Sequence, residues 1–281
     1  MHYREYEAPE SLRRHIQCVW RLSADGDPTY IDTVYPDGHC ELIVHLKNPM
    51  QVLRPDNSWH QQADCLFAAQ QRSAIRLAAR SELDCIGARL QPAASAAISI
   101  TRLAELRDQI VALRDLDPDF VPRFTKAARQ FSGDASGGQI WAVLESRLLA
   151  YQVDSRIEQA VDELINAQGR GSIAAIAARA AMSLRSFQTK FLQQVGLSAK
   201  EFSRILRLQA TIQSLDNSRD SLAQLALQTG FSDQAHATRE VRRLTGLTPA
   251  RLRQALERNR AGEHTIRMAA AFVRGVRSQA L

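Results

Sequence analysis

Four residues within one short segment have the types that bind metal ions. His39, Cys40, Glu41 and His45 lie close together, and imidazole, thiolate and carboxylate groups are the usual protein ligands of zinc and related metals. If the segment is a β-strand, His39, Glu41 and His45 share one face and Cys40 points to the other. The spacing does not fit a catalytic metal site. Turn-flanking or core polar groups are the favoured interpretation, so we expect no metal and no cofactor.

The cysteines give little sign of redox or metal chemistry. Cys18, Cys40, Cys65 and Cys85 contain no CxxC pair among them, so neither a disulfide framework nor a zinc signature is indicated. Redox sensing would need a thiolate that nothing nearby in the sequence stabilises. The motifs GxSxG, HExxH, Walker A and GxGxxG are absent from the sequence, and we expect no enzymatic activity.

Composition and charge indicate a globular chain with one polyanion-binding part. Of the 281 residues, 45% are hydrophobic and 23% charged, which favours roughly two domains. A membrane span is not expected, and the charged first residues predict a cytoplasmic protein without a signal peptide. Residues 1–170 hold 19 Lys and Arg against 23 Asp and Glu, whereas residues 171–281 hold 17 against 7. Such an asymmetry indicates nucleic acid or an anionic membrane surface as a partner of the second part. On charge alone, a solvated Arg-rich helical surface explains it equally well.

The first part reads as β-structure followed by helices. Short apolar runs separated by turn residues favour an antiparallel sandwich or barrel, and Tyr35-Pro36-Asp37-Gly38 is a strong turn signal. The predicted strands are 15–22, 40–46, 64–69, 74–79 and 83–90. Helical periodicity begins near residue 92. The predicted helices of this part are 93–100, 102–113, 121–131 and 139–151, with a loop at 132–138.

An internal repeat lies in the basic part of the chain. Residues 172–183 align with residues 221–232 at a shift of 49 positions, and Gly196-Leu197-Ser198 aligns with Gly246-Leu247-Thr248 at a shift of 50. Each copy predicts a helix-turn-helix, with a serine cap on its first helix. A turn follows at Ala181-Met182 or Gly230-Phe231, where glycine suits a left-handed helix end.

The second helix of each copy carries a polar face suited to DNA. The residues predicted to be buried are Leu184, Phe187 and Phe191 in the first copy, and Ala237, Val241 and Leu244 in the second. The side chains left exposed are rich in Arg and Gln, which form bidentate hydrogen bonds with guanine and adenine, and in groups that hold phosphates. A polar helical bundle would explain the apolar stripes but not the duplication and the positive charge together, so DNA binding is favoured.

The two segments 183–200 and 231–253 resemble the first and second helix-turn-helix signatures of the AraC/XylS family. The resemblance covers about residues 160–255. It implies a seven-helix domain in which a long helix near 199–215 joins two units whose recognition helices enter successive major grooves. By position, it assigns base contacts to Arg185, Gln188, Thr189, Gln234, Ala235, His236 and Arg239. Phosphate contacts are assigned to Ser183, Lys190, Ser232, Arg242 and Arg243.

Three positions depart from the family pattern. Positions 237 and 241, which are usually large, are Ala237 and Val241, and position 252, usually Tyr, is Leu252. The expectation is a looser core in the second unit. Residues 36–45 resemble a segment of one branch of the family, although the identity of a ligand does not transfer with it.

The sequence therefore predicts an α+β protein with an N-terminal antiparallel β-rich domain and a C-terminal all-α double helix-turn-helix domain. The expected divisions are a sensor at 1–100, a helical linker or dimerisation region at 101–154, the DNA-binding domain at 155–257 and a basic, partly helical tail at 258–281. The expected activity is sequence-specific binding of double-stranded DNA under control of a small ligand. The resemblance also allows RNA polymerase and a second copy of the chain as partners.

Two alternatives remain open at this stage. One is a regulator without a ligand, controlled by its abundance or by a protein partner. The other is a redox or metal sensor fused to the DNA-binding domain. A membrane-surface protein is disfavoured, because the positive charge lies on two helix-turn-helix units rather than on one amphipathic stripe.

Overall fold

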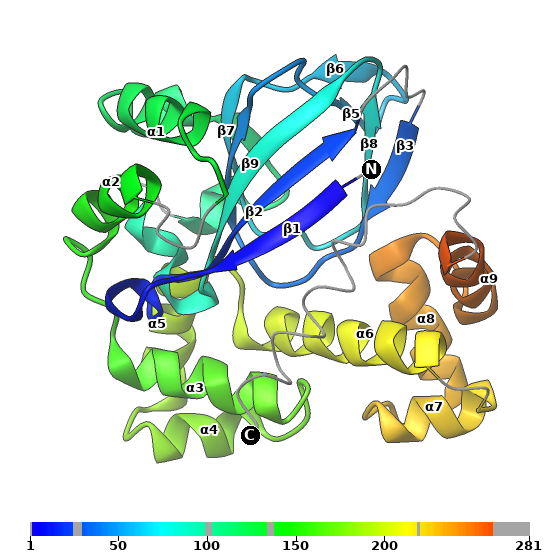
Figure 1. Cartoon of the computed structure of the whole chain (residues 1–281). Helices are drawn as coiled ribbons and strands as arrows, with labels where there is room; N and C mark the ends of the chain where they lie inside the picture. Colours follow the sequence, from blue (N-terminus) through cyan, green and yellow to red (C-terminus); the bar gives the residue numbers. More distant parts are fainter. Residues whose placement is uncertain (1, 25–29, 99–102, 134–137, 218–219, 261–281) are drawn as a thin grey trace.

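Strands precede helices along the chain in the computed structural model (Figure 1), which describes residues 2–24, 30–98, 103–133, 138–217 and 220–260. The strands are β1 (His2–Glu7), β2 (Ile16–Ala24), β3 (Tyr30–Val34), β4 (Glu41–His45), β5 (Gln51–Leu53), β6 (Trp59–Gln61), β7 (Cys65–Ala68), β8 (Ile75–Ala79), β9 (Leu83–Leu90) and β10 (Ile110–Ala112). The helices are α1 (Phe120–Arg129), α2 (Gly138–Leu148), α3 (Ser155–Asn166), α4 (Ile173–Arg179), α5 (Leu184–Val195), α6 (Ala199–Asn217), α7 (Leu222–Gln228), α8 (Gln234–Thr245) and α9 (Pro249–Arg260). The fold is α+β, as the sequence predicts.

The strands form two antiparallel sheets. The larger sheet has the order β1-β2-β9-β4-β7-β10, and the smaller has the order β3-β8-β5-β6. Side chains alternate along each strand, so Trp20 and Leu22 of β2 lie in the core between the sheets, while Val19 belongs to the core on the opposite face of the larger sheet. The central strands of the larger sheet are thus buried on both faces, which explains their continuous apolar runs.

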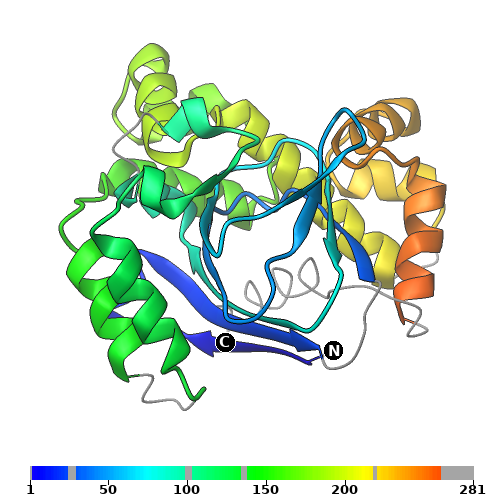
Figure 2. The ribbon, with the colours of Figure 1, turned by 90° about the horizontal axis from the view of Figure 1, so that it is seen from above.

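Helices α1 and α2 cover the outer face of the larger sheet. Phe124 of α1 and Leu144 of α2 are fully buried in one apolar cluster with Leu42, Phe67 and Ile86 of the sheet. Figure 2 shows these two helices on one side of the sheets and α7 to α9 on the other.

The remaining helices form two groups joined by α6. In Figure 1, α6 runs beneath the sheets from α3, α4 and α5 at one end to α7, α8 and α9 at the other. Its 19 residues confirm the predicted long helix near 199–215. Within the described part of the chain, every helix is too short or too polar to cross a membrane.

All five predicted strands are present, and the structure adds β1, β3, β5, β6 and β10. The helix predicted at 102–113 is wrong. Its described residues form a short 3-10 helix, Leu103–Leu106, followed by β10, whose three residues pair with β7 at the sheet edge. Residues 92–97 also form a 3-10 helix instead of the start of an α-helix. The predicted loop at 132–138 and the predicted tail helix at 264–276 lie partly or wholly outside the described residues.

Candidate nucleic-acid interface

The first helix-turn-helix unit consists of α4 and α5. The hydroxyl of Ser172 accepts a hydrogen bond from the backbone N–H of Ala175 at 3.4 Å, and that of Ser183 accepts one from Ser186 at 3.2 Å. Ser172 is therefore the predicted cap of the first helix, and Ser183 caps the second helix in the same way. Between the helices, Ala181 has a φ of 52°, a left-handed conformation that costs a non-glycine residue about 1 kcal/mol.

The exposed face of α5 contains the residues assigned to base contacts. Arg185, Gln188 and Thr189 are all exposed, and the Thr189 hydroxyl donates to the backbone carbonyl of Arg185 at 3.0 Å. Phe187 and Phe191 are buried as predicted. The prediction that Leu184 is buried is wrong, because its side chain is 44% exposed at the first turn of the helix. An apolar group thus lies beside Arg185 on this surface.

Lys190 lies at the edge of this face and is only half-exposed. Its ammonium group is 3.2 Å from the Asp154 carboxylate, which also caps α3 and binds Arg156. The pKa of the Asp154 carboxyl is lowered, chiefly by the side-chain hydrogen bond from Arg156 and also by the one from Lys190. The lysine is therefore partly neutralised before any phosphate approaches.

The second unit, α7 and α8, repeats this arrangement with stronger capping. Ser221 and Gln224 form a reciprocal capping box at the start of α7, and Gly230 has the expected left-handed φ of 82°. At the start of α8, the cap is the carboxylate of Asp233, which accepts the N–H of His236 at 2.7 Å. This backbone hydrogen bond lowers the pKa of Asp233. The Ser232 hydroxyl donates to the same carboxylate.

The outward face of α8 is basic and polar. Gln234, Ala235, Arg239, Arg242 and Arg243 are exposed. His236 is half-buried, since its ring stands edge-on to Phe231 and its Nδ1 lies 3.1 Å from the Ser232 hydroxyl. The predicted buried residues Ala237, Val241 and Leu244 are all buried.

The core of the second unit is completed by the N-terminal half of the chain. Tyr35, directly after β3, is only 8% exposed and packs in one cluster with Leu208, Val241, Leu244 and Leu252. A small void of about 10 Å³ remains beside Ala237. An aromatic side chain from the N-terminal half therefore packs into this core, a contact that the sequence did not predict.

One short segment between β7 and β8 contacts the ends of both recognition helices. Gln70 lies against Gly196, which ends α5. Arg72 forms an ion pair of 3.5 Å with Glu201 at the start of α6. The N–H of Ala74 donates to the Leu244 carbonyl in the last turn of α8 at 2.7 Å. We call residues 69–74 the bridging segment.

The turn at 35–38 makes a second junction with α6. The Gln209 side chain donates to the Pro36 carbonyl. A Cβ added at Gly38 would lie 2.7 Å from the Phe202 ring, and this glycine has a φ of 85°. The close approach and the backbone conformation together explain why glycine occupies this position. Residues far apart in the sequence therefore hold α6 against the sheets.

The potential metal ligands have protein partners instead. His39 Nδ1 lies 2.8 Å from the Leu90 carbonyl, Glu41 accepts hydrogen bonds from Trp20 and Arg89, and His45 Nε2 lies 3.2 Å from Gln62. In the described parts of the chain, no group of three His, Cys, Asp or Glu side chains is placed to hold a metal.

The cysteine thiols are buried and disulfide-free. Burial raises the pKa of Cys18 and Cys40 to about 12 and that of Cys65 to about 11, and it also raises the pKa of Cys85. The thiolate that redox sensing requires is therefore strongly disfavoured at these positions.

Two parts of the chain match the models of known domain families. Residues 176–255 match the model of a helix-turn-helix domain family, and residues 4–112 match a domain of unknown function, DUF6597. The HTH-type transcriptional activator RhaS of Escherichia fergusonii is 36% identical over 80 residues, which cover 28% of this chain and 29% of RhaS.

Several solved structures are similar to part or most of the chain. The apo form of a ToxT variant from Vibrio cholerae strain SCE256 is 11% identical, with a TM-score of 0.46, covering 89% of this chain and 99% of ToxT. A regulator from Chromobacterium violaceum, described as containing an AraC-type DNA-binding domain, is 25% identical with a TM-score of 0.34, covering 36% of this chain and 92% of the other.

The chain thus combines an N-terminal β-rich domain with two C-terminal helix-turn-helix units, and residues 176–255 match a helix-turn-helix domain family. With the RhaS similarity added, the C-terminal part of the chain resembles the AraC/XylS family, and the chain spans less than a third of the length of RhaS in that match.

Proposed function

We propose that α5 and α8 enter successive major grooves on one face of a DNA duplex, about one helical turn apart. The observation that carries this proposal is the repeated geometry: each unit ends in a capped helix whose first turns expose Arg and Gln side chains. The base contacts are made by Arg185, Gln188 and Thr189 from α5 and by Gln234, Ala235, His236 and Arg239 from α8. The phosphate contacts come from Ser183, Lys190, Ser232, Arg242 and Arg243.

The N-terminal domain sets the relative positions of the two recognition helices in this proposal. The bridging segment contacts Gly196 and Leu244, at the C-terminal ends of α5 and α8. The assigned base contacts lie nearer the N-terminal ends and are exposed, except for the half-buried His236. A small ligand that favours one position of this segment would change how well both helices fit the DNA together. Its effect equals its difference in affinity for the two arrangements.

Two alternatives to ligand control are disfavoured by the environments of the cysteines and of the potential metal ligands. The redox alternative is disfavoured by the raised pKa values of the buried cysteines, and the metal alternative by the protein partners of His39, Glu41 and His45. A regulator without a ligand would bind DNA through the same surface of the protein. Its bridging segment would then only hold the two recognition helices in fixed positions.

The test is fluorescence anisotropy of the whole protein with DNA from upstream of its own gene, over a series of salt concentrations. Arg185→Ala and Arg239→Ala are each expected to cost about 1–3 kcal/mol in specific binding and to relax base preference locally. Arg54→Ala, which removes an exposed charge from the β-rich domain, is the matched control. Unchanged affinity and base preference in both recognition-helix variants would refute the assignment.

A further inference from the structure

A groove lies on the outer face of the larger sheet, away from both recognition helices. It is formed where α1 crosses the start of β7 and the residues that follow β10, and its cavity volume is about 610 Å³. Cavities of about 300–1,000 Å³ are typical of small-molecule sites. The residues that line it are Asp64, Cys65, Arg114, Val121, Pro122, Thr125, Lys126, Arg129 and Gln130.

The groove has an excess of positive charge. Arg114, Lys126 and Arg129 line it together with a single carboxylate, Asp64. Each of the three cations is exposed, and none has a carboxylate within 4 Å among the described residues, in contrast to Arg147 nearby, which pairs with Asp117 at 2.5 Å. Unpaired guanidinium groups at a concave surface favour carboxylate and phosphate ligands, which they bind in a bidentate manner.

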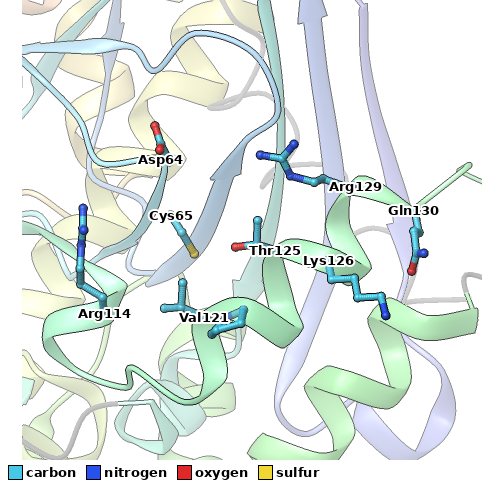
Figure 3. A pocket seen from close by; sticks show the side chains of 9 residues that line it. Asp64, Cys65, Arg114, Val121, Thr125, Lys126, Arg129 and Gln130 are labelled. Carbon is cyan, nitrogen blue, oxygen red and sulfur yellow. The ribbon is translucent and has the colours of Figure 1, made fainter.

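The side chains of the groove also define an apolar part. Figure 3 shows Arg114 and Arg129 on opposite sides of Cys65 and Thr125, with Val121 below them and Lys126 further along α1. Val121 packs against the main core and Cys65 is buried within it. A ligand in the groove would contact cations at the rim and aliphatic or thiol groups at the floor. The complementary ligand is therefore an anion that carries a small apolar group.

The space between the two sheets is already filled. Trp20 and Arg89 are each 1% exposed there, the Arg89 guanidinium binds Glu41 at 2.9 Å, and the Trp20 ring lies so close to Gly87 that a Cβ on this residue would be 2.2 Å away. A ligand in that space would have to displace a buried ion pair. The outer groove requires no such rearrangement.

We infer that this groove binds a small organic anion, a carboxylate or phosphate ester attached to an apolar group, through Arg114 and Arg129. Its role as the effector site rests on the ligand control proposed above.

Two adjacent strands connect the groove with the bridging segment. β7 begins at Cys65 in the groove and continues directly into residues 69–74. β10 pairs with β7, ends just before Arg114, and is preceded by Asp108. Asp108 forms an ion pair of 2.5 Å with Arg72, and its N–H donates to the Gln70 carbonyl. A displacement of α1 against β7 would therefore be transmitted along paired backbone to the ends of both recognition helices.

Isothermal titration calorimetry of the full chain tests the inference with benzoate, phenyl phosphate and the neutral analogue benzamide. Benzoate and phenyl phosphate should bind at a single site, and benzamide at least tenfold more weakly. In the Arg114→Gln/Arg129→Gln variant, affinity for both anions should fall at least tenfold. The matched control is Arg54→Gln/Arg123→Gln, which removes two exposed charges, one of them on α1 but outside the groove.

The titrations distinguish binding in the groove from binding elsewhere on the protein. Loss of anion binding in the groove variant but not in the control supports the site. The inference is overturned if neither anion binds, if benzamide binds as tightly as benzoate, or if the groove variant binds like the wild type. Thermal melting of each variant checks that these surface substitutions preserve the fold. Because the titration contains no DNA, failure of anion binding and failure of DNA recognition are measured separately.

Discussion

The backbone N–H of Ala74 donates a 2.7 Å hydrogen bond to the carbonyl oxygen of Leu244, in the last turn of α8. The last carbonyls of a helix have no partner within the helix, and here one of them is bound by the β-rich domain. Gly246, in the left-handed conformation, donates its N–H to the Arg242 carbonyl. The end of the second recognition helix is therefore fixed partly by its own cap and partly by a segment about 170 residues earlier in the chain.

Ala74→Pro removes this donor without adding charge. We expect the free energy of unfolding to fall by about 1 kcal/mol, the net value of one hydrogen bond, with a further loss if Ser73 must change its conformation. Urea denaturation measures the change. Ala74→Ser keeps the N–H and is the control. If the two variants were equally stable, the hydrogen bond to Leu244 would have no measurable role.

Tyr35→Ala should destabilise the second helix-turn-helix unit. Removal of a buried aromatic ring from the cluster with Val241 and Leu252 is expected to cost about 3 kcal/mol. Tyr35→Phe retains the ring and should lie within about 1 kcal/mol of the wild type. Thermal melting compares the two variants. A fragment of residues 155–281, which lacks Tyr35, should likewise bind DNA less tightly than the whole chain, and equal affinity would contradict this contribution.

The salt dependence of DNA binding should distinguish two basic residues. Arg242 is exposed on α8, whereas the ammonium group of Lys190 already lies 3.2 Å from Asp154. Arg242→Ala should reduce the slope of log affinity against log salt by about 0.9, which corresponds to one phosphate contact. Lys190→Ala should weaken binding evenly across sequences, with a smaller change in slope. Anisotropy titrations over a series of salt concentrations measure both slopes, and a larger effect at Lys190 would reverse this ranking.

The stability of the β-rich domain should fall on mild acidification because of His45. Burial lowers the pKa of this histidine to about 4, since protonation would place a proton on Nδ1, which is buried without a hydrogen-bond partner among the described residues. In the unfolded chain, the pKa of His45 is about 6.5. Between about pH 4 and about pH 6.5, the unfolded chain therefore binds more protons at this residue than the folded chain does. The free energy of unfolding therefore decreases as the pH falls below about 6.5, and the decrease ends at about pH 4.

Between about pH 7 and about pH 5, this single histidine should account for about 2 kcal/mol of the loss. His45→Gln removes the titrating group, so its free energy of unfolding should change less over that interval. Urea denaturation at both pH values, for the variant and the wild type, measures the difference. An identical pH dependence in the two proteins would show that His45 is not responsible.

Local patterns in the sequence were enough to predict many of the helices and strands. The repeat at 172–183 and 221–232 predicted two helix-turn-helix units, because serine caps, a left-handed turn and apolar stripes are all encoded within about 20 residues. The same reasoning predicted β2, β4, β7, β8 and β9, and the apolar runs of β2, β4 and β9 reflect burial on both faces of the larger sheet. It failed at residues 102–113, where β10 exists only because β7 offers a partner edge, and at Leu184, where the first helical turn lies beyond the reach of the core.

The contacts between the two halves of the chain could not be predicted from local patterns. Tyr35, Gln70 and Ala74 carry no local signal for contact with a recognition helix, since their partners lie far along the chain and the contacts arise from packing. For the same reason, the groove beside Cys65 could not be predicted, because Arg114 and Arg129 come together with β7 only after α1 has folded onto the sheet. Periodicity records which face of an element is buried, but it does not record which distant residue buries it.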